Sequence, residues 1–391
     1  MIAITAATLF TPLERIEQPM LLVEDGSIVE VTSRTRRELP ENGRSVDFKD
    51  AILAPGFIDI HIHGGAGHDV MESGAGALPP VERLLADHGV TSYFPTTVTA
   101  PLDATLSALG RLADAIEAGD RDAGGTDLLT NVRARPLGIH LEGPFISHRR
   151  RGVHPPEDLL TPSLAAFERF WQAARGHIRV MTIAPELPGA IEVITEAVKR
   201  GVCVSLGHSD ADLTAARAGV AAGARHATHT FNAMRPLDHR DPGIMGEVLT
   251  DSRLSADIIA DGIHLDPVIV QLFLRTKGPD AAVLITDATA ATGMPDGRYR
   301  LGSLEVEVKD GKCMSGGKLA GSVLTVDLAV RKVMQFAHWD LQHAVRLATL
   351  NPARVVGLNS GGSITPGDTA DLVVLSPSGD IRNTIIRGAG I

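Results

Sequence analysis

The chain has 391 residues, of which 44% are hydrophobic and 21% charged, proportions typical of a folded globular protein rather than a disordered one. The 37 Lys and Arg residues against 47 Asp and Glu residues give a net charge of −10. This balance disfavours nucleic-acid binding, which usually needs a basic face. The length suits one large domain with a smaller appendage.

The cysteine content and the first residues bear on the cellular location. Two cysteines, Cys203 and Cys313, are too few for a framework of several disulfide bridges. The amino-terminal residues lack the basic segment and the long apolar run of a signal peptide, and no apolar stretch is long enough to cross a bilayer. We therefore expect a cytoplasmic protein without membrane association.

Strand-like and helix-like patterns follow one another along most of the chain. Residues 1–54 alternate apolar and polar positions, which is typical of strands. Eight further strands are expected at 56–63, 91–97, 136–142, 178–184, 202–208, 226–230, 254–260 and 281–287, with helical patterns at 103–118, 163–175, 188–200, 210–222 and 266–276 between them. Such alternation predicts parallel strands with crossover helices, and eight units fit a closed (β/α)8 TIM-like barrel better than an open sheet.

The remaining segments predict a second, β-rich part. Residues 298–314 are expected to form a hairpin at the strong turn dipeptide Asp310-Gly311. Residues 363–387 again alternate apolar and polar positions. We expect residues 1–54 and 358–391 to pair into a small β-sandwich domain, and residues 55–357 to form the barrel as the catalytic domain.

Side chains that bind metals stand at the predicted carboxyl ends of the barrel strands. These residues are His61, His63, Glu142, His208, His229 and Asp287. In a parallel barrel, functional groups gather at this end of the strands, and residues i and i+2 of one strand share a face. Imidazole and carboxylate ligands suit zinc or iron better than magnesium. The pattern therefore predicts a divalent metal site, whereas His140 lies deeper on its strand and is expected to pack in the core.

Several segments resemble a known family. Pro55-Gly56-Phe57-Ile58-Asp59-Ile60-His61-Ile62-His63 resembles the first barrel motif of the amidohydrolase superfamily. The segments 138–145 (GIHLEGPF), 207–209 (GHS), 228–234 (THTFNAM), 261–264 (DGIH) and 286–289 (TDAT) are similar to those of the N-acetylglucosamine-6-phosphate deacetylases, in the same order. The likeness runs across nearly the whole chain.

The resemblance implies an enzyme that hydrolyses the acetamide of an amino sugar phosphate and releases acetate and the free amine. It implies that Glu142, His208 and His229 hold a principal metal ion, and that His61 and His63 belong to a second site. One or two ions, zinc or iron, are thus expected per subunit. Asp287 is implied as the general base and general acid of the reaction.

The same resemblance implies a set of residues that contact the substrate: His154, Asn232, Ala233, Arg240, His264 and Ala320. His154 would face the carbonyl oxygen, and Arg240 would bind the phosphate, for which a guanidinium is well suited. The run Arg149-Arg150-Arg151 fits a solvated loop or a steering patch for anions. A homodimer is common in this family, and it would allow phosphate contacts from the partner subunit.

Other functions remain open at the level of sequence. A deacetylase of the galactosamine isomer fits the same motifs. A cyclic-amide hydrolase is disfavoured, because such enzymes usually bridge two metals with a carboxylated lysine and this chain offers Glu142 instead. A non-catalytic scaffold is disfavoured, because every expected ligand position is filled.

Overall fold

The computed structural model describes residues 1–11, 13–39, 44–74, 76–121 and 132–390. Residues 12, 40–43 and 391 of the predicted small domain, and residues 75 and 122–131 of the predicted barrel domain, lie outside the described residues. No helix in the described part of the chain is both long enough and apolar enough to cross a lipid bilayer.

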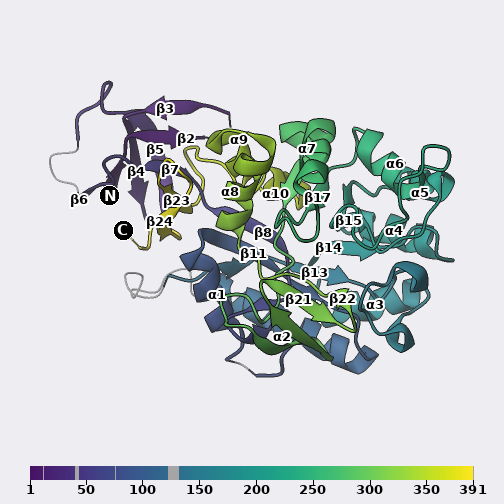
Figure 1. Ribbon diagram of the computed structural model, residues 1–391. Coiled ribbons are helices and arrows are strands. Elements are labelled where there is room, and N and C mark those ends of the chain that lie inside the picture. Colours follow the sequence, from purple (N-terminus) through teal and green to yellow (C-terminus); the bar gives the residue numbers. More distant parts are fainter. Residues whose placement is uncertain (12, 40–43, 75, 122–131, 391) are drawn as a thin grey trace.

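Eight parallel strands form the centre of the fold (Figure 1). They are β8 (Phe57–Ile62), β11 (Val90–Thr97), β13 (Ile139–Glu142), β14 (Ile178–Ile183), β15 (Cys203–Leu206), β16 (His226–Ala227), β17 (Ala256–Ile258) and β18 (Ala282–Leu284). The first six pair in chain order, with the short β12 (Arg135–Pro136) beside β11, and β17 pairs with β18. Backbone hydrogen bonds join the two groups at both edges, from Thr230 to Asp257 O and from Asp287 to His61 O, each 2.9 Å. The strands therefore curl in the manner of a TIM-like barrel.

Seven of the eight predicted strands contain an observed strand and the one predicted at 91–97 overlaps β11 except for Val90, but several predicted carboxyl ends are wrong. The strand predicted at 226–230 ends at Ala227, and those predicted at 202–208 and 281–287 end at Leu206 and Leu284. The cause is a backbone turn beyond each strand, where His208, His229 and Asp287 have positive φ angles of 46°, 30° and 51°. Positive φ is incompatible with an extended ladder. His208, His229 and Asp287 thus stand just beyond their strands instead of within them.

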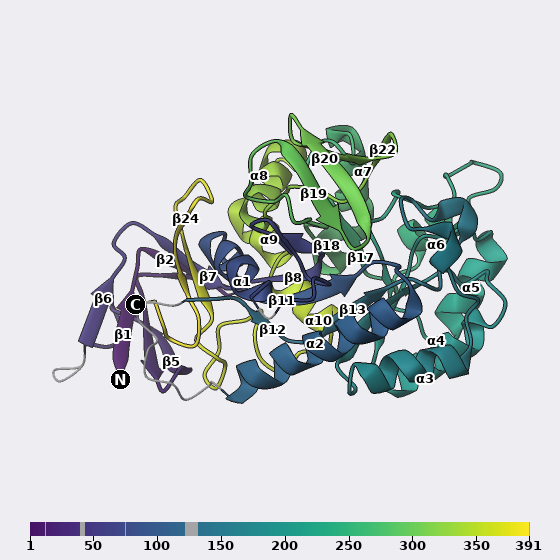
Figure 2. The ribbon, with the colours of Figure 1, turned by 90° about the horizontal axis from the view of Figure 1, so that it is seen from below.

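Helices surround the parallel strands (Figures 1 and 2). They are α1 (Leu78–Asp87), α2 (Leu102–Arg121), α3 (Leu164–Ala173), α4 (Ala190–Lys199), α5 (Leu213–Ala221), α6 (Gly243–Thr250), α7 (Pro267–Ala281), α8 (Val326–Ala337), α9 (Leu341–Arg346) and α10 (Leu350–Val355), with short 3-10 turns at His148–Arg150 and Pro156–Asp158. Side-chain oxygens of Ser163, Asp212 and Asp266 accept hydrogen bonds from the first turns of α3, α5 and α7. Such caps satisfy backbone donors that lack a partner in the helix, so the sequence itself determines where these helices begin.

The two chain ends pair with each other in a separate β-rich part. One sheet has the order β5 (Ser27–Ser33), β4 (Pro19–Glu24), β1 (Ile2–Thr5), β6 (Arg44–Asp47), and the other has the order β24 (Ile381–Ile385), β23 (Leu372–Leu375), β7 (Ile52–Pro55), β2 (Thr8–Phe10), β3 (Arg15–Glu17). Buried side chains such as Leu21, Leu53 and Leu372 form their common core. The termini accordingly lie together on this side of the molecule (Figures 1 and 2). The two chain ends thus share one β-rich part with a common core.

An antiparallel sheet is inserted after β18. It consists of β19 (Gly297–Leu301), β20 (Leu304–Lys309), β21 (Lys312–Ser315) and β22 (Lys318–Leu319), paired in that order. The turn at Asp310-Gly311 lies between β20 and β21, and both residues have positive φ, as the predicted turn requires. The prediction of a hairpin is confirmed but incomplete, because the sheet has four strands. Figure 2 shows this inserted sheet projecting on one side of the parallel strands. Two short strands, β9 (Gly64–Gly65) and β10 (His68–Asp69), pair near it.

A partly buried ion pair connects the end of α1 to the start of α8. Asp327 lies 3.0 Å from Nδ1 of His88 and accepts a hydrogen bond of 2.9 Å from Arg331. Burial raises the pKa of Asp327, but hydrogen bonds from His88 and Thr325 outweigh burial and lower that pKa to about 2. Because the folded-state pKa lies below the ordinary value of 3.8, the stabilisation is complete above that value and is lost as the pH falls toward 2.

We predict that Asp327→Asn lowers the free energy of unfolding by about 2 kcal/mol at pH 7, and by roughly half as much at pH 3. Thermal unfolding of the variant and the parent at both pH values measures the difference, with the exposed Asp114→Asn on α2 as a control. A destabilisation equal at pH 7 and pH 3 would show that the carboxylate charge is not the cause.

Candidate metal centre and active site

Six side chains of the metal-binding types converge at the carboxyl ends of the parallel strands. His61 lies on β8 and His63 directly follows it, while Glu142 ends β13. His208 and His229 follow β15 and β16 by two residues, and Asp287 follows β18 by three. None of the six is more than 8% exposed. Side chains from five different strands therefore meet in one buried cluster.

The Glu142 carboxylate is the centre of this cluster. Its Oε1 lies 3.1 Å from Nε2 of His229, 3.3 Å from Nε2 of His208 and 3.4 Å from Nε2 of His61. Its Oε2 lies 3.3 Å from Nε2 of His63. One carboxylate is thus within about a hydrogen-bond length of four imidazoles, all of which present the same ring nitrogen.

Asp287 approaches the two histidines of the first strand. Its Oδ1 lies 3.1 Å from Nε2 of His63 and 3.4 Å from Nε2 of His61. Two groups of potential ligands result, with the ligand atoms of each group within 4.8 Å of one another: Glu142, His208 and His229, and His61, His63 and Asp287. Imidazole nitrogens and carboxylate oxygens are a donor set that binds zinc or iron. The residues present therefore fit one or two divalent metal ions.

Hydrogen bonds behind two of the rings fix which nitrogen faces the cluster. His63 donates from Nδ1 to the carbonyl of Thr96 (3.0 Å), and His208 donates from Nδ1 to the carbonyl of Arg150 (2.8 Å). Because a carbonyl only accepts, Nδ1 carries the proton in both rings and Nε2 keeps a lone pair for a metal ion.

His229 is held through its backbone. Its N–H donates to the carboxylate of Asp257, which also accepts a hydrogen bond of 2.8 Å from Nε2 of His226. The neighbouring Thr230 N–H donates to the main-chain oxygen of Asp257 (2.9 Å). Strand β17 therefore anchors the end of β16 and aims the His229 ring into the cluster.

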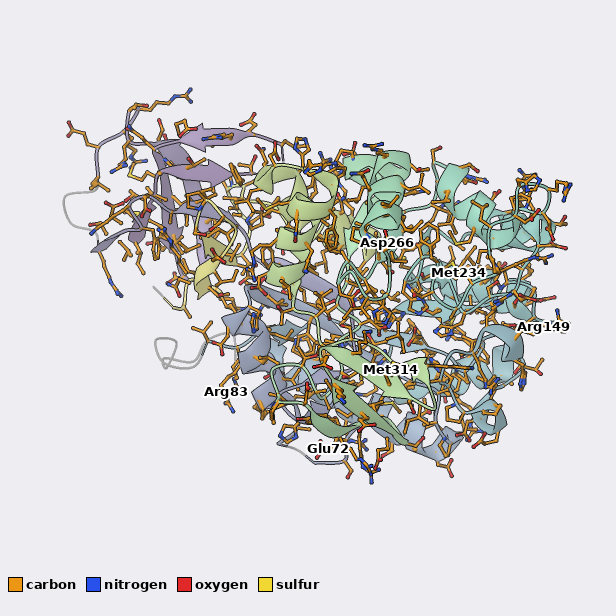
Figure 3. All side chains as sticks on the ribbon, viewed as in Figure 1. Glu72, Arg83, Arg149, Met234, Asp266 and Met314 are labelled. Carbon is orange, nitrogen blue, oxygen red and sulfur yellow. The ribbon has the colours of Figure 1, made fainter. Side chains whose placement is uncertain are left out.

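The loop that contributes the Arg150 carbonyl is itself tied down. Arg150 Nε donates to Asp210 (2.7 Å), and Asp210 N–H donates in turn to Glu186 (2.6 Å). Arg149, in contrast, is largely exposed at the outer edge of the molecule (Figure 3). Of the predicted arginine run, Arg150 thus braces the His208 side of the site, and Arg149 is solvated.

The charges of the cluster depend on one another. Burial raises the pKa of Glu142, but the nearby imidazoles, His61 first, lower it well below its ordinary value. Burial likewise raises the pKa of Asp287, while His61 and His63 lower it to about 2. The converse holds for His229, where burial lowers the pKa and Glu142 raises it to about 9. Both carboxylates are therefore ionised near neutral pH.

His154 stands beside this cluster in a defined state. Burial first, and then the neighbouring His208, lower the pKa of His154 to about 3, so the ring is neutral. Its Nδ1 accepts the backbone N–H of Thr99 (3.2 Å), which leaves the ring proton on Nε2. Gly143 permits this packing, because its φ is +75° and a Cβ there would lie 2.3 Å from Oγ1 of Thr99. His154 therefore offers an N–H donor next to Glu142, 3.7 Å from its Oε2.

His140 takes no part in the cluster. Its Nδ1 donates to the carbonyl of Ile60 (3.0 Å), and its Nε2 accepts the hydroxyl proton of Thr182 (2.8 Å). With both nitrogens occupied, His140 lies in the core below His61, as the sequence predicts.

A cavity of about 240 Å3 opens over the cluster. Its lining includes ten of the twelve predicted site residues, namely His63, Glu142, His154, His208, His229, Asn232, Ala233, His264, Asp287 and Ala320. His61 lies beneath the cavity and is fully buried. Leu319 and Gly321, which flank Ala320 in a segment that resembles a pocket-lining loop of the family, also line the cavity, whereas Val98, Gly152, Val153, Ile259 and Leu301 had no role assigned from the sequence.

Arg240 is the predicted site residue that lies elsewhere. It is exposed, and its backbone N–H donates to Asp238 in the same loop (2.8 Å). Of the described residues that line the cavity, none is an arginine or a lysine. Arg240 is therefore not part of the cavity wall of one chain.

Asn232 and His264 give one side of the cavity a polar character. Nδ2 of Asn232 is buried and has no hydrogen-bond partner among the described residues. His264 is held by Asp261, whose carboxylate lies 2.7 Å from Nδ1 and also accepts the backbone N–H of His264 (2.8 Å). This side thus carries a buried amide nitrogen without a partner among the described residues and an imidazole fixed by Asp261.

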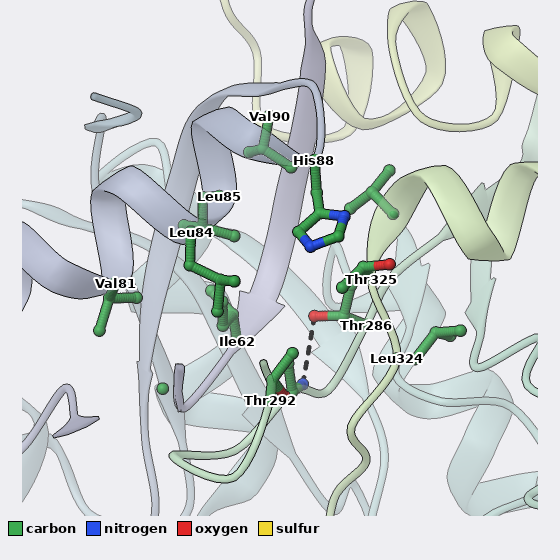
Figure 4. Close-up of a pocket in the computed structure, with 13 residues that line it drawn as sticks. Ile62, Val81, Leu84, Leu85, His88, Val90, Thr286, Thr292, Leu324 and Thr325 are labelled. Carbon is green, nitrogen blue, oxygen red and sulfur yellow. Dashed lines mark hydrogen bonds between the residues drawn. The ribbon is translucent and has the colours of Figure 1, made fainter. Parts of the chain in front are cut away.

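A second, much smaller cavity lies behind the cluster (Figure 4). It measures about 10 Å3 and is lined largely by apolar groups of β8, α1 and α8, among them Ile62, Leu85 and Val326. The hydroxyl of Thr286 in its wall already accepts the N–H of Ala288 (3.1 Å). A space of this size holds at most one water molecule. The larger cavity is therefore the candidate substrate site.

Comparison with known proteins agrees with this geometry. The model of the amidohydrolase family matches residues 52–390. The chain is 35% identical to an N-acetylglucosamine-6-phosphate deacetylase of Lysinibacillus sphaericus, over 96% of this chain and 93% of that one. It is 39% identical to an N-acetylgalactosamine-6-phosphate deacetylase of Escherichia coli O157:H7, over 88% of this chain and 89% of that one.

A solved structure is equally similar. The crystal structure of N-acetyl-D-glucosamine-6-phosphate deacetylase from Mycobacterium smegmatis superimposes with a TM-score of 0.91 at 33% identity, and the match covers 100% of both chains. The family expected from the motifs is thereby confirmed. This chain belongs to the amidohydrolase family and, within it, groups with the N-acetylglucosamine-6-phosphate deacetylases.

Proposed function

We propose that this protein hydrolyses the acetamide of N-acetylglucosamine 6-phosphate to glucosamine 6-phosphate and acetate. The observation that carries the proposal is the cluster of four imidazoles and two carboxylates beneath a cavity with a polar side. The relatives named above act on this substrate or on its galactosamine isomer. In this proposal residues 55–357 form a (β/α)8 barrel that carries the site, and residues 1–54 and 358–391 form a small β-sandwich.

The two ligand groups would hold divalent metal, zinc or iron. Glu142, His208 and His229 would bind the principal ion, and His61 and His63, with Asp287 beside them, a second one. A metal ion bound there lowers the pKa of water and polarises an amide carbonyl. Cysteine is absent from the described residues of the cavity wall, and so is the lysine of a carboxylated bridge, which disfavours a cyclic-amide hydrolase.

Asp287 is proposed as the residue that moves the proton. It is ionised and faces the cavity, so it accepts a proton from the water that attacks the carbonyl carbon. When the C–N bond breaks, Asp287 returns this proton to the leaving nitrogen, and the products are the amine and acetate. His154 donates its Nε2–H to the carbonyl oxygen, on which negative charge develops during the attack.

The polar side of the cavity would bind the sugar phosphate. Asn232 offers its unpaired Nδ2 donor, Ala233 its backbone, and His264 a ring fixed by Asp261. Arg240 lies outside the cavity of one chain, so in this proposal it reaches the phosphate across a homodimer. The inserted loop with Ala320 closes the other side.

The galactosamine isomer is the second candidate substrate, because the relative from Escherichia coli is as similar as the others. A purely structural role is disfavoured by the convergence of six ionisable side chains in one buried cluster. Burial of so many charged groups is unfavourable unless they bind one another or a metal.

We predict that Glu142→Gln weakens metal binding by more than about 100-fold, beyond the 10–100-fold that loss of an outer partner of a ligand causes. Elemental analysis after dialysis against a weak chelator measures the bound metal. The matched control is Glu247→Gln, since Glu247 is equally buried but is paired with Arg217 on the outside of the barrel. Normal metal content in Glu142→Gln would exclude Glu142 as a ligand.

We predict that Asp287→Asn reduces kcat by about 10²–10⁴-fold, because the amide neither accepts nor returns the proton. The metal held by Glu142, His208 and His229 should remain. Steady-state kinetics on N-acetylglucosamine 6-phosphate, with metal content measured on the same sample, test both statements. A variant with bound metal and an unchanged kcat would contradict the assignment of Asp287.

We predict that Asn232→Ala raises KM for N-acetylglucosamine 6-phosphate by about 10–100-fold, because it removes a hydrogen bond to the charged phosphate. Turnover of unphosphorylated N-acetylglucosamine should change little. Equal losses of kcat/KM on both sugars would place Asn232 at the acetamide or the sugar ring.

A comparison of kcat/KM for N-acetylglucosamine 6-phosphate and N-acetylgalactosamine 6-phosphate in the parent enzyme decides between the two isomers.

A further inference from the structure

The two sides of the cavity mouth differ in polarity. In chain order β11 is the second and β16 the sixth of the eight parallel strands, so the loops that follow them lie on opposite sides of a curled barrel sheet. The loop after β16 carries Asn232, with its unpaired amide donor. The segment after β11 carries Val98, and Leu301 of the inserted sheet lines the cavity with it. One side of the cavity is thus polar and the other apolar.

Leu301 is held firmly at this place. Only 3% exposed, it packs with Val306, Val308 and Cys313 in the small core of the inserted sheet. The backbone N–H of the next residue, Gly302, donates to the buried carboxylate of Asp69 (2.7 Å). The end of β19 is therefore fixed to the barrel by a hydrogen bond as well as by apolar packing.

The turn after Leu301 also presses against Val98. A Cβ on Gly302 would lie 2.3 Å from Cγ1 of Val98, so the two segments are already at closest approach. Val98 is 3% exposed and is positioned from behind, where its N–H meets the sulfur of Met71 (3.2 Å). Val98 and Leu301 thus form a closely packed wall with little room behind it to yield to a bound molecule.

This wall lies next to the reacting groups. Val98 follows β11 directly, and the Thr96 carbonyl on β11 holds His63, which lies 3.1 Å from Asp287. On the other edge, Gly321 is so close to Asp287 that a Cβ there would lie 2.9 Å from the Asp287 carbonyl oxygen. If the substrate's amide carbonyl lies at Asp287 and its sugar phosphate lies toward Asn232, the acyl group on the other side of the carbonyl points at Val98 and Leu301.

We infer that Val98 and Leu301 set the length of the acyl group that this enzyme removes, and restrict it to acetyl. The inference rests on the proposed deacetylase function and adds two residues that fix its specificity. Each additional methylene would meet this closely packed wall, and misfit of one methylene typically changes kcat/KM by about 10–200-fold.

The test compares three substrates on the metal-loaded, full-length protein: the N-acetyl, N-propionyl and N-butyryl forms of glucosamine 6-phosphate. In the parent enzyme kcat/KM should fall at least about 10-fold from acetyl to propionyl, and further for butyryl. Leu301→Ala should raise the propionyl-to-acetyl ratio of kcat/KM by at least about 10-fold. Val98→Ala, made on the barrel side of the wall, should shift the ratio in the same direction.

Val306→Ala is the matched control. Val306 belongs to the same small core as Leu301 and is fully buried, but it does not line the cavity. It should therefore loosen the inserted sheet to a similar extent without changing the acyl preference. A shift with Val306→Ala equal to that with Leu301→Ala would overturn the inference.

The inference and the proposed function fail in different ways. No turnover of any of the three substrates by the metal-loaded parent would refute the proposed function, and the inference with it. Turnover of the acetyl substrate, with equal turnover of the butyryl substrate or with unchanged ratios in both Leu301→Ala and Val98→Ala, would overturn the inference alone.

Discussion

The contact of one buried carboxylate with four imidazoles is the constraint on which the site depends. Glu142 is 3% exposed, and its oxygens lie 3.1–3.4 Å from His61, His63, His208 and His229. A carboxylate removed from water in this way is strongly unfavourable unless cationic groups or a metal ion surround it. The imidazoles around Glu142 would supply that environment together with a metal ion that they bind, but only while four separate strand ends keep their positions. Much of the surrounding structure can be understood as a means of holding those ends.

The ends of these strands are held mainly through hydrogen bonds to backbone groups. Main-chain carbonyls of Thr96 and Arg150 orient two of the rings, and the Asp257 carboxylate fixes a third through its backbone N–H. The positive φ angles at His208, His229 and Asp287 turn these residues off their strands and into the centre. Such conformations are unfavourable for residues other than glycine and persist only where neighbouring contacts impose them. The packing of the barrel core therefore offsets the unfavourable backbone conformations at these three residues.

This division explains what the sequence could and could not predict. The eight strands followed from periodicity, and six residues of metal-binding types could be found near the predicted strand ends, although three of those ends were placed two or three residues too far along the chain. The turns at His208 and His229 could not be predicted, since they depend on contacts with Arg150, in the loop after β13, and with Asp257 on β17. Arg240 was assigned by its motif, yet its side chain lies outside the cavity, because a motif carries no information on where its loop projects. No motif or spacing in the sequence indicated that Leu301 would line the cavity.

Leu301 also shows why fold and specificity are separable in this molecule. The strands and the turns that follow them supply all the ionisable groups of the cluster, whereas the inserted sheet contributes an apolar surface and no ligand among the described residues. That sheet has its own core, in which Val306 and Val308 alternate with exposed residues along β20. A change in the sheet can therefore alter the shape of the cavity without disturbing Glu142. Because chemistry and shape are fixed by different segments, substrate range can vary among such barrels while the reaction is conserved.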